Sequence, residues 1–262
     1  MAEADPEPRT WPKAPLLAQL YDWEHDEFTA DTELYISLAQ RTGGPVLEAA
    51  CGTGRVLEPL ARRGFYVVGF DSSPEMLARA ARRLEDVTKR ATLIRSSLAD
   101  PLPEGSFRLV IFALDALGLA LETTAEQLDV LRRVSAAIAP DGVLALDLVH
   151  AAPLADQPEG VPVLQRSTFD HEIGATVTKW IVRRLFPATQ VLELDCFYDL
   201  SWADGGFSRL EETINLHYFS RYEIELLLDR AGFRIEAIYG DYDLEGFDDD
   251  SPRMIVLANR QA

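Results

Sequence analysis

Residues 46–71 read VLEAACGTGRVLEPLARRGFYVVGFD and contain the pattern that decides the fold. Two apolar runs, at 46–47 and 66–70, each end at a carboxylate, which is Glu48 in the first case and Asp71 in the second. Small residues, glycines and a helical stretch lie between them, so the segment predicts a strand, a glycine turn, a helix and a second strand. Such a turn brings backbone N–H groups close to a ligand, and the pattern therefore predicts nucleotide binding.

Strands and helices continue to alternate along most of the chain. Apolar residues at spacings of three and four predict two short helices between residues 13 and 41. Core strands are expected at 46–49, 66–70, 91–95, 107–114, 143–148, 233–240 and 253–259, with a turn at 140–142. Helices are expected at 55–63, from Ser73-Pro74 onward, at 123–138 and at 220–231. This order predicts an α/β fold with a mostly parallel sheet and helices on both faces.

The pattern changes between residues 161 and 217, where the apolar period falls to two. Antiparallel strands are expected there at 165–169, 175–186, 190–200 and 207–216. Because this segment follows a strand of the α/β core, we expect it to cover the edge of the sheet where such folds bind ligands. The chain is thus predicted to be one domain over 1–262, with an N-terminal helical lid (1–44), a nucleotide-binding core (45–150 and 218–262) and an antiparallel β insertion over the substrate site (151–217).

Composition narrows the class of function. Acidic residues outnumber basic ones by 43 to 25, which gives a net charge of −18. A surface so negative repels phosphate backbones, so no nucleic-acid partner is expected. No membrane contact is expected either, because no apolar run approaches the roughly 20 residues that cross a bilayer. Residues 1–13 lack the regions of a secretory signal and only Cys51 and Cys196 are present, so we expect a cytoplasmic protein.

The glycine turn distinguishes between classes of nucleotide. A dinucleotide fingerprint has a third glycine, but this chain has Gly52 and Gly54 followed by Leu57. A carboxylate at Glu48 would also repel a pyrophosphate, which disfavours a nicotinamide dehydrogenase. S-adenosylmethionine carries an ammonium and a sulfonium and no phosphate. The residues therefore favour S-adenosylmethionine as the cofactor.

Further motifs extend over roughly residues 15 to 260. The chain contains, in order, LEAACGTGRVLEPLARRG, VVGFDSSPEML, FRLVIFALDALG, LRRVSAAIAPDGVLALDLV and FSRYEIELLLDRAGF. Together these segments resemble class I S-adenosylmethionine-dependent methyltransferases. The resemblance implies a Rossmann-like, seven-stranded mixed sheet whose last strand is antiparallel. The leading YDW element and the insertion are similar to small-molecule methyltransferases, including glycine-type and sugar amine N-methyltransferases.

The resemblance also implies which residues hold the methionine and ribose parts of the cofactor. Glu48 and the backbone of Ala50 and Gly52 would face the methionine, with Gly54 completing the turn. Asp71 would accept hydrogen bonds from both ribose hydroxyls through its two carboxylate oxygens. The chain departs from the usual motif at Ala50, where relatives have the first glycine.

A second implied group surrounds the adenine. Ser72 and Met76 would border the ring, while Ser97 and the backbone N–H of Leu98 would line its edge. Many relatives have Asp at the position of Ser97, so adenine recognition there is expected to be weaker. Tyr21 matches a tyrosine that closes over the cofactor, although an aromatic residue at helical spacing can equally be core.

The methyl acceptor is less well defined by the sequence. Ala113 lies near the end of the fourth strand and completes the implied cofactor set, and Asp115 follows near the expected acceptor position. Asp115 could orient or deprotonate an amine or hydroxyl, or could be a turn residue. His150, His171 and His217 are candidate bases with suitable pKa, and His150 follows the fifth strand most closely. We take Asp115, His150 and His217 as the candidate catalytic groups.

Metal dependence is not expected. Asp115 and Asp147 stand where metal-dependent catechol methyltransferases have acids, but Leu148 replaces the Asn of their usual Asp-Asn pair. The predicted activity is in-line methyl transfer to a nitrogen or oxygen of a small molecule. A cofactor-binding protein without transfer activity and a methyltransferase with a protein acceptor stay open as alternatives, and the oligomeric state is not predicted. Aromatic residues that could line the acceptor pocket are Trp23, Trp180, Tyr198 and Tyr218.

Overall fold

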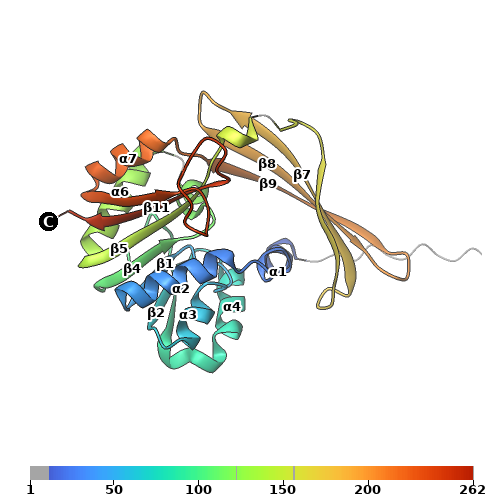
Figure 1. Cartoon of the computed structure of the whole chain (residues 1–262). Helices are drawn as coiled ribbons and strands as arrows, with labels where there is room; N and C mark the ends of the chain where they lie inside the picture. Colours follow the sequence, from blue (N-terminus) through green and yellow to red (C-terminus); the bar gives the residue numbers. More distant parts are fainter. Residues whose placement is uncertain (1–11, 122, 156, 262) are drawn as a thin grey trace, which may run out of the picture.

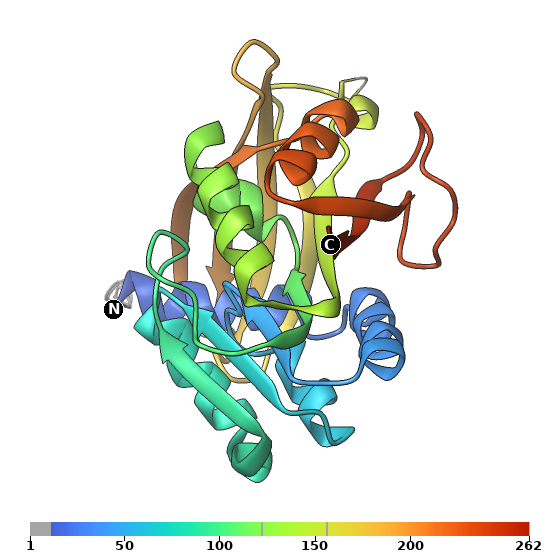
Figure 2. The ribbon, with the colours of Figure 1, turned by 90° about the vertical axis from the view of Figure 1, so that its left-hand side faces the viewer.

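The computed structural model describes residues 12–121, 123–155 and 157–261. Residues 1–11 of the expected N-terminal lid lie outside these described residues. A seven-stranded sheet forms the core, and a separate four-stranded sheet extends from one side of it (Figure 1). In the view of Figure 2 the core faces the reader and the four-stranded sheet lies behind it.

The core sheet has the mixed topology that the resemblance implied. Its strands are β1 (Val46–Ala49), β2 (Val67–Asp71), β3 (Ala91–Arg95), β4 (Phe107–Phe112), β5 (Ile138–Val149), β10 (Phe233–Tyr239) and β11 (Arg253–Arg260). They lie in the order β10-β11-β5-β4-β1-β2-β3. Neighbours from β5 to β3 are parallel, whereas β11 runs antiparallel to both β5 and β10. The prediction that the last strand is antiparallel is confirmed.

The helices begin largely where the capping residues predict. They are α1 (Lys13–His25), α2 (Ala30–Thr42), α3 (Leu57–Arg62), α4 (Pro74–Arg83), α5 (Ala116–Ala120), α6 (Thr124–Ala137) and α7 (Arg221–Arg230), with short 3₁₀ turns at Glu85–Arg90 and Ala152–Leu154. The side chain of Ser73 caps α4, and capping boxes open α6 and α7. Within the described segments, no helix is both long and apolar enough to span a bilayer.

Both faces of the core sheet are covered by helices. On one face, buried residues of α6 and α7 such as Leu131 and Leu228 share a cluster with Phe112. On the other face, α2 and α3 pack through residues such as Tyr35 and Leu60. Strands buried on both faces are almost entirely apolar, which is why the sequence signal for β1 and β4 was strong.

In the core sheet, two strand boundaries differ from prediction by two residues or more. The expected turn at 140–142 lies inside β5, which begins at Ile138 and has an irregular register with β4. Gly142 permits this path, because a Cβ there would lie 2.7 Å from Ile138 Cγ1. The strand β4 ends at Phe112 rather than at 114, since Leu114 and Asp115 have φ of 45° and 65°. Those angles lie outside the β region, so the chain must turn there.

The insertion forms the predicted antiparallel sheet. Its strands are β6 (Val163–Asp170), β7 (Ala175–Phe186), β8 (Val191–Ser201) and β9 (Phe207–His217), hydrogen-bonded in that order. Leu20 and Trp23 of α1 pack with Val177 and Leu200 on one face of this sheet. At the other end β9 touches α5, where a Cβ on Gly118 would lie only 2.1 Å from the carbonyl oxygen of His217.

The helix α1 lies between the insertion and the core. Asp22 forms ion pairs with Arg79 and Arg83 of α4, and Trp23 Nε1 donates a hydrogen bond to Thr168 of β6 at 2.9 Å. The helix is therefore fastened on one side to the core and on the other to the insertion. The helix α2 instead packs against the core sheet.

Candidate functional site

The turn after β1 depends on left-handed backbone conformations. Ala50, Gly52 and Gly54 have φ of 52°, 52° and 76°. The conformation at Ala50 costs about 1 kcal/mol for a residue with a Cβ, which explains why relatives use glycine there. A Cβ on Gly54 would lie 3.2 Å from that of Ala80 in α4, so glycine also permits close helix packing.

The missing third glycine of a dinucleotide fingerprint is compensated on the facing strand. A Cβ on Gly69 of β2 would lie 2.4 Å from Leu57 Cδ1 and 2.8 Å from Cys51 Sγ. The space that Leu57 fills is therefore provided by Gly69. Burial raises the pKa of the Cys51 thiol well above its ordinary value, so this residue is a small side chain in a crowded turn rather than a reactive thiolate.

Glu48 is the most unusual side chain of the site. It is 3% exposed, and among the described residues its Oε2 atom has no hydrogen-bond partner. Thr53 Oγ1, in the adjoining turn, is likewise buried without a partner there. Burial raises the pKa of Glu48 well above its ordinary value, although the Arg55 guanidinium opposes this. Because buried polar groups are almost always paired, these two atoms fit a ligand that brings its own donors, such as an ammonium group.

Asp71 connects the end of β2 to the turn. Its Oδ2 accepts the Gly52 N–H at 2.9 Å, and its Oδ1 accepts the Ser73 N–H at 2.9 Å. Each carboxylate oxygen has a second lone pair, so both stay able to accept a ribose hydroxyl. The carboxylate therefore fixes the turn and the start of α4 while pointing its remaining acceptors outward.

Tyr21 brings α1 to the glycine turn. A Cβ at Gly52 would lie 3.8 and 3.9 Å from two ring atoms of Tyr21. Burial raises the pKa of Tyr21 to about 12, which keeps the phenol neutral. The ring therefore covers the turn, as a residue that closes over a cofactor would. That role stays a prediction.

The expected adenine-side residues lie in adjacent segments. The Ser96 N–H donates to the Asp71 carbonyl oxygen at 3.1 Å, so the ends of β2 and β3 are side by side. Asp100 accepts the Ser97 N–H at 2.8 Å. The loop thus contains a carboxylate, although the position where the resemblance implies Asp is occupied by Ser97. Leu98 is buried in the same loop. Ser72 is exposed just after β2, and the partly buried Met76 lies in the first turn of α4.

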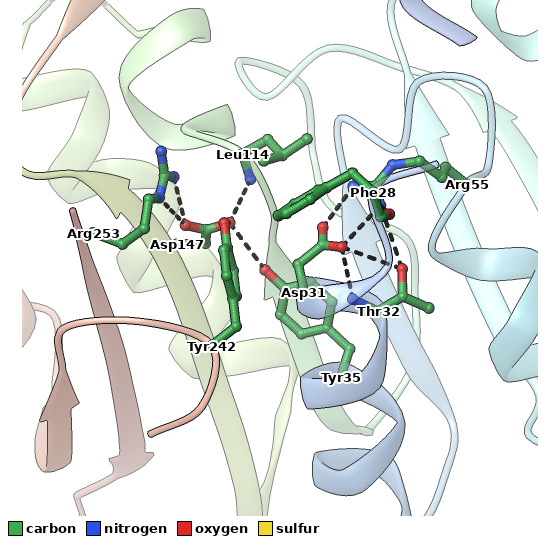
Figure 3. A network of polar contacts seen from close by, with 9 residues as sticks. All are labelled: Phe28, Asp31, Thr32, Tyr35, Arg55, Leu114, Asp147, Tyr242 and Arg253. Atoms are coloured by element: carbon green, nitrogen blue, oxygen red, sulfur yellow. Dashed lines mark hydrogen bonds and ion pairs between the residues drawn. The ribbon is translucent and has the colours of Figure 1, made fainter. Parts of the chain in front are cut away.

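A buried ion pair between Arg55 and Asp31 lies beside the glycine turn (Figure 3). The sequence did not predict this pair. Arg55 donates to Asp31 at 2.8 and 2.5 Å and to the Phe28 carbonyl oxygen at 2.9 Å. Asp31 is fully buried in the first turn of α2. The only signals in the sequence were an acid at a helix start and an arginine in the turn, which are common separately. Together they fix the α1–α2 connection to the glycine turn.

A second network surrounds Asp147 at the end of β5 (Figure 3). Its Oδ2 accepts the Tyr242 hydroxyl at 2.9 Å and the Leu114 N–H at 3.1 Å, with the Tyr35 hydroxyl at 3.5 Å. Its Oδ1 accepts Arg253 Nε at 2.7 Å. The network holds the loop after β4 in its left-handed conformation. Ala113 begins that loop, beside β1, and is partly buried against the core.

Asp115 is engaged in the same network. Its Oδ2 pairs with Arg253 Nη1 at 3.0 Å, and its Oδ1 accepts the Val149 N–H. Burial raises the pKa of Asp115, while Arg253 lowers it. To act as a base, Asp115 would have to give up this ion pair. The structure thus supports the turn role that sequence reasoning left open beside the catalytic one.

The predicted histidines are not brought together. His150 Nδ1 lies 2.9 Å from the Ser251 carbonyl oxygen, and His217 Nε2 lies 3.4 Å from Glu223 Oε1. His171 is exposed in the turn between β6 and β7. A fourth histidine, His25, which was not considered, has its ring 4.5 Å from that of Tyr21. Its place in α1, four residues after Tyr21, was the signal that could have found it.

A buried charge cluster joins α1 to the insertion. Lys179 of β7 is 5% exposed, and its Nζ lies 2.5 Å from both carboxylate oxygens of Glu24. The Tyr198 hydroxyl donates to the same carboxylate at 3.4 Å. Burial and the Glu24 charge raise the pKa of Tyr198. Trp180 follows Lys179 directly in the strand and so lies on the opposite face, away from α1, which makes it a poor pocket residue.

Two other features of the molecule concern metal binding and a groove outside the expected cofactor site. Within the described residues there is no group of three or more His, Cys, Asp or Glu side chains that could hold a metal ion. A groove of about 480 Å³ lies between α7 and β10. That strand is at the far edge of the sheet from β1 and β2, and none of the expected cofactor residues line the groove.

Comparison with known proteins relates part of the chain to a family. Residues 46–142 match the family model described as "Methyltransferase domain". A dTDP-3-amino-3,6-dideoxy-α-D-glucopyranose N,N-dimethyltransferase of Streptomyces fradiae is 26% identical over 231 residues, which cover 86% of each chain.

Solved structures agree on the fold. An S-adenosylmethionine-dependent methyltransferase from Clostridium acetobutylicum has 16% identity and a TM-score of 0.79, covering 94% of this chain and 98% of that one. The S-adenosylmethionine-bound CalS10, an amino pentose methyltransferase from Micromonospora echinaspora, has 22% identity and a TM-score of 0.70, covering 98% and 100%. Residues 46–142 thus match a methyltransferase domain, and the chain as a whole has the fold of class I, S-adenosylmethionine-dependent methyltransferases.

Proposed function

We propose that this protein transfers a methyl group from S-adenosylmethionine to an amine nitrogen of a small molecule. The observation that carries the proposal is the buried Oε2 atom of Glu48, which has no hydrogen-bond partner among the described residues and lies beside a glycine turn and the Asp71 carboxylate. An ammonium at one end and a ribose at the other would satisfy these groups, and S-adenosylmethionine has both. A dinucleotide would instead bring a pyrophosphate toward Glu48.

The residues of the site have separate tasks in this reaction. When bound, S-adenosylmethionine supplies a methyl group on a positively charged sulfur. Glu48 would pair with its ammonium group, and Asp71 would accept its ribose hydroxyls. Tyr21 would cover the turn and exclude water, which favours a displacement that depends on positioning. The insertion would enclose the acceptor opposite these groups.

Two comparisons favour an amine acceptor. The Streptomyces fradiae relative is an N,N-dimethyltransferase of an amino sugar, and CalS10 is an amino pentose methyltransferase. A small acceptor suits a site in which α1 and the insertion lie close to the turn.

The two cysteines are buried and free, which suits the reducing cytoplasm that we also propose.

Calorimetry and a transfer assay test this function. The protein should bind S-adenosylhomocysteine, and failure to bind it would refute the proposal. The transfer panel should contain dTDP-3-amino-3,6-dideoxyglucose, glycine, a catechol and a lysine-rich peptide. Methylation of an amine in the panel supports the proposal. Methylation of the catechol or the peptide alone would replace it with an O-methyltransferase or a protein methyltransferase. Binding without any transfer would favour a cofactor-binding protein.

A further inference from the structure

His25 occupies the position between the glycine turn and the insertion. Its ring lies 4.5 Å from the ring of Tyr21, with an interplanar angle of 50°. Tyr21 in turn lies over Gly52, where the methionine part of the cofactor is expected. On its other side His25 adjoins the charge cluster of Glu24 and Lys179. A small acceptor held between α1 and the insertion would therefore meet this imidazole.

Charges face His25 from every element packed around it. Glu24 precedes it in α1, with Oε2 at 3.9 Å from His25 Nε2, and Lys179 approaches from β7. Arg55 after the turn and Asp31 of α2 act from the core side. Burial is the main influence and lowers the pKa of His25 below its ordinary value, with Lys179 and Arg55 acting in the same direction. Glu24 and Asp31 oppose the shift. The imidazole is thus neutral at neutral pH and able to accept a proton.

His25 differs from His150 and His217 in its hydrogen bonding. His150 and His217 are each within hydrogen-bond distance of an oxygen through one ring nitrogen. Among the described residues, neither ring nitrogen of His25 makes a hydrogen bond, and the side chain is 26% exposed. The partly exposed imidazole therefore has hydrogen-bonding capacity left for a substrate. A carboxylate at 3.9 Å favours the protonated imidazole through its charge.

We propose that His25 is the proton acceptor for the amine that becomes methylated, with Glu24 as the nearby carboxylate that stabilises its protonated form. This inference rests on the proposed function. The acceptor amine arrives as an ammonium ion, and an unprotonated ring nitrogen of His25 takes one of its protons. The freed lone pair then forms the new N–C bond while the electron pair of the C–S bond leaves with sulfur. His25 passes its proton to water, and the methylated product leaves as an ammonium ion. Glu24, held by Lys179 and Tyr198, stabilises the imidazolium that forms.

The kinetic test compares His25→Gln with His171→Gln, which changes an exposed histidine in the β6–β7 turn. S-adenosylhomocysteine binding, measured by calorimetry, should stay within a few-fold in both variants. With the amine that the transfer panel identifies, kcat should fall about 100-fold in His25→Gln only. The wild-type rate should also decline as pH falls through the His25 pKa, and this acidic limb should vanish in His25→Gln. A His25→Gln enzyme with an unchanged rate and pH profile would overturn the proposal.

A second measurement does not depend on turnover. Imidazole signals in nuclear magnetic resonance spectra of the wild-type complex with S-adenosylhomocysteine should show one histidine that titrates below its ordinary range, and His25→Gln should remove that signal. Glu24→Gln should move the titration to still lower pH, because it deletes the charge that favours the imidazolium. A His25 that is protonated at neutral pH overturns the proposal. Loss of S-adenosylhomocysteine binding by the wild-type protein would instead refute the proposed function.

Discussion

The glycine-turn edge of the core and the face of the insertion differ in whether their buried polar groups have hydrogen-bond partners. In the core, Glu48 Oε2 and Thr53 Oγ1 are buried without partners among the described residues. In the insertion, Lys179 is as deeply buried, but both oxygens of Glu24 bind it. An unmade buried hydrogen bond costs about 1–3 kcal/mol, so it persists where a ligand completes it. The core edge thus suits the ligand that we propose, whereas the insertion is held by its own contacts.

The largest expected effect is on the core edge. Asp71→Ala removes the acceptor of two backbone N–H groups and the expected ribose contact, so S-adenosylhomocysteine binding should weaken about 100-fold or more. Calorimetry gives the affinity directly. Asp249→Ala, in an exposed loop, is the matched control and should bind normally. Equal affinities of the two variants would remove Asp71 from the ribose site.

Glu48→Gln should weaken the same binding by about 10- to 100-fold, because a charge-assisted bond to the ammonium becomes a neutral one. The pH dependence sharpens this prediction. The pKa of Glu48 is raised in the free protein and an ammonium favours the ionised form, so binding releases a proton. Wild-type affinity should therefore increase as pH rises toward that raised pKa, and Glu48→Gln should lack the increase. Calorimetry over a pH series, in buffers of different ionisation enthalpy, measures both the affinity and the number of protons released. A wild-type affinity that does not depend on pH would contradict the contact between Glu48 and the ammonium group.

The packing of the turn gives a smaller effect, on stability. Gly69→Ala places a methyl group 2.4 Å from Leu57 Cδ1 and should lower the free energy of unfolding by about 1–3 kcal/mol. Leu57→Ala in the same chain should recover part of this loss, since it removes the clashing atom. Urea unfolding of the single and double variants measures the coupling. Strictly additive effects would mean that the two residues do not share the space.

The smallest effect is expected at the insertion. Lys179→Met leaves the partly exposed Glu24 without its cation and should lower the free energy of unfolding by about 1–2 kcal/mol. The double variant Glu24→Gln, Lys179→Met should be closer to the wild type, because no unpaired charge is left behind. Urea unfolding again gives the values. A double variant less stable than both single ones would show that the pair matters for more than charge balance.

The fold was largely predictable because its signals are local. Apolar runs, the capping boxes and the period of two in the insertion each depend on neighbouring residues, and they gave the strands, the helix starts and the change of sheet. The boundary errors arose where tertiary contacts decide the conformation. The left-handed backbone of Leu114 and Asp115 is held by Asp147, which is more than thirty residues away along the chain.

In the candidate site, too, the contacts between residues close in sequence could be predicted, and those that depend on tertiary structure could not. The turn residues from Glu48 to Asp71 are close in sequence, so their grouping around one ligand could be predicted. The partners of Asp115 could not, because Arg253 reaches it only through the antiparallel placement of β11 next to β5. The spacing of four residues between Tyr21 and His25 could have placed the imidazole beside the turn. The charges of Lys179 and Arg55 that act on it could not be predicted, because they come from β7 and from the turn.

The contact between Gly118 and His217 has a consequence for substitution. A Cβ at Gly118 would lie 2.1 Å from the His217 carbonyl oxygen and 2.9 Å from Leu216 Cδ1, so β9 and α5 are in close contact at this glycine. At the opposite end, the insertion meets α1 through paired side chains, such as Lys179 with Glu24 and Trp23 with Thr168. A single substitution can remove one of these contacts at α1. At Gly118, by contrast, even a methyl group would force β9 and α5 apart.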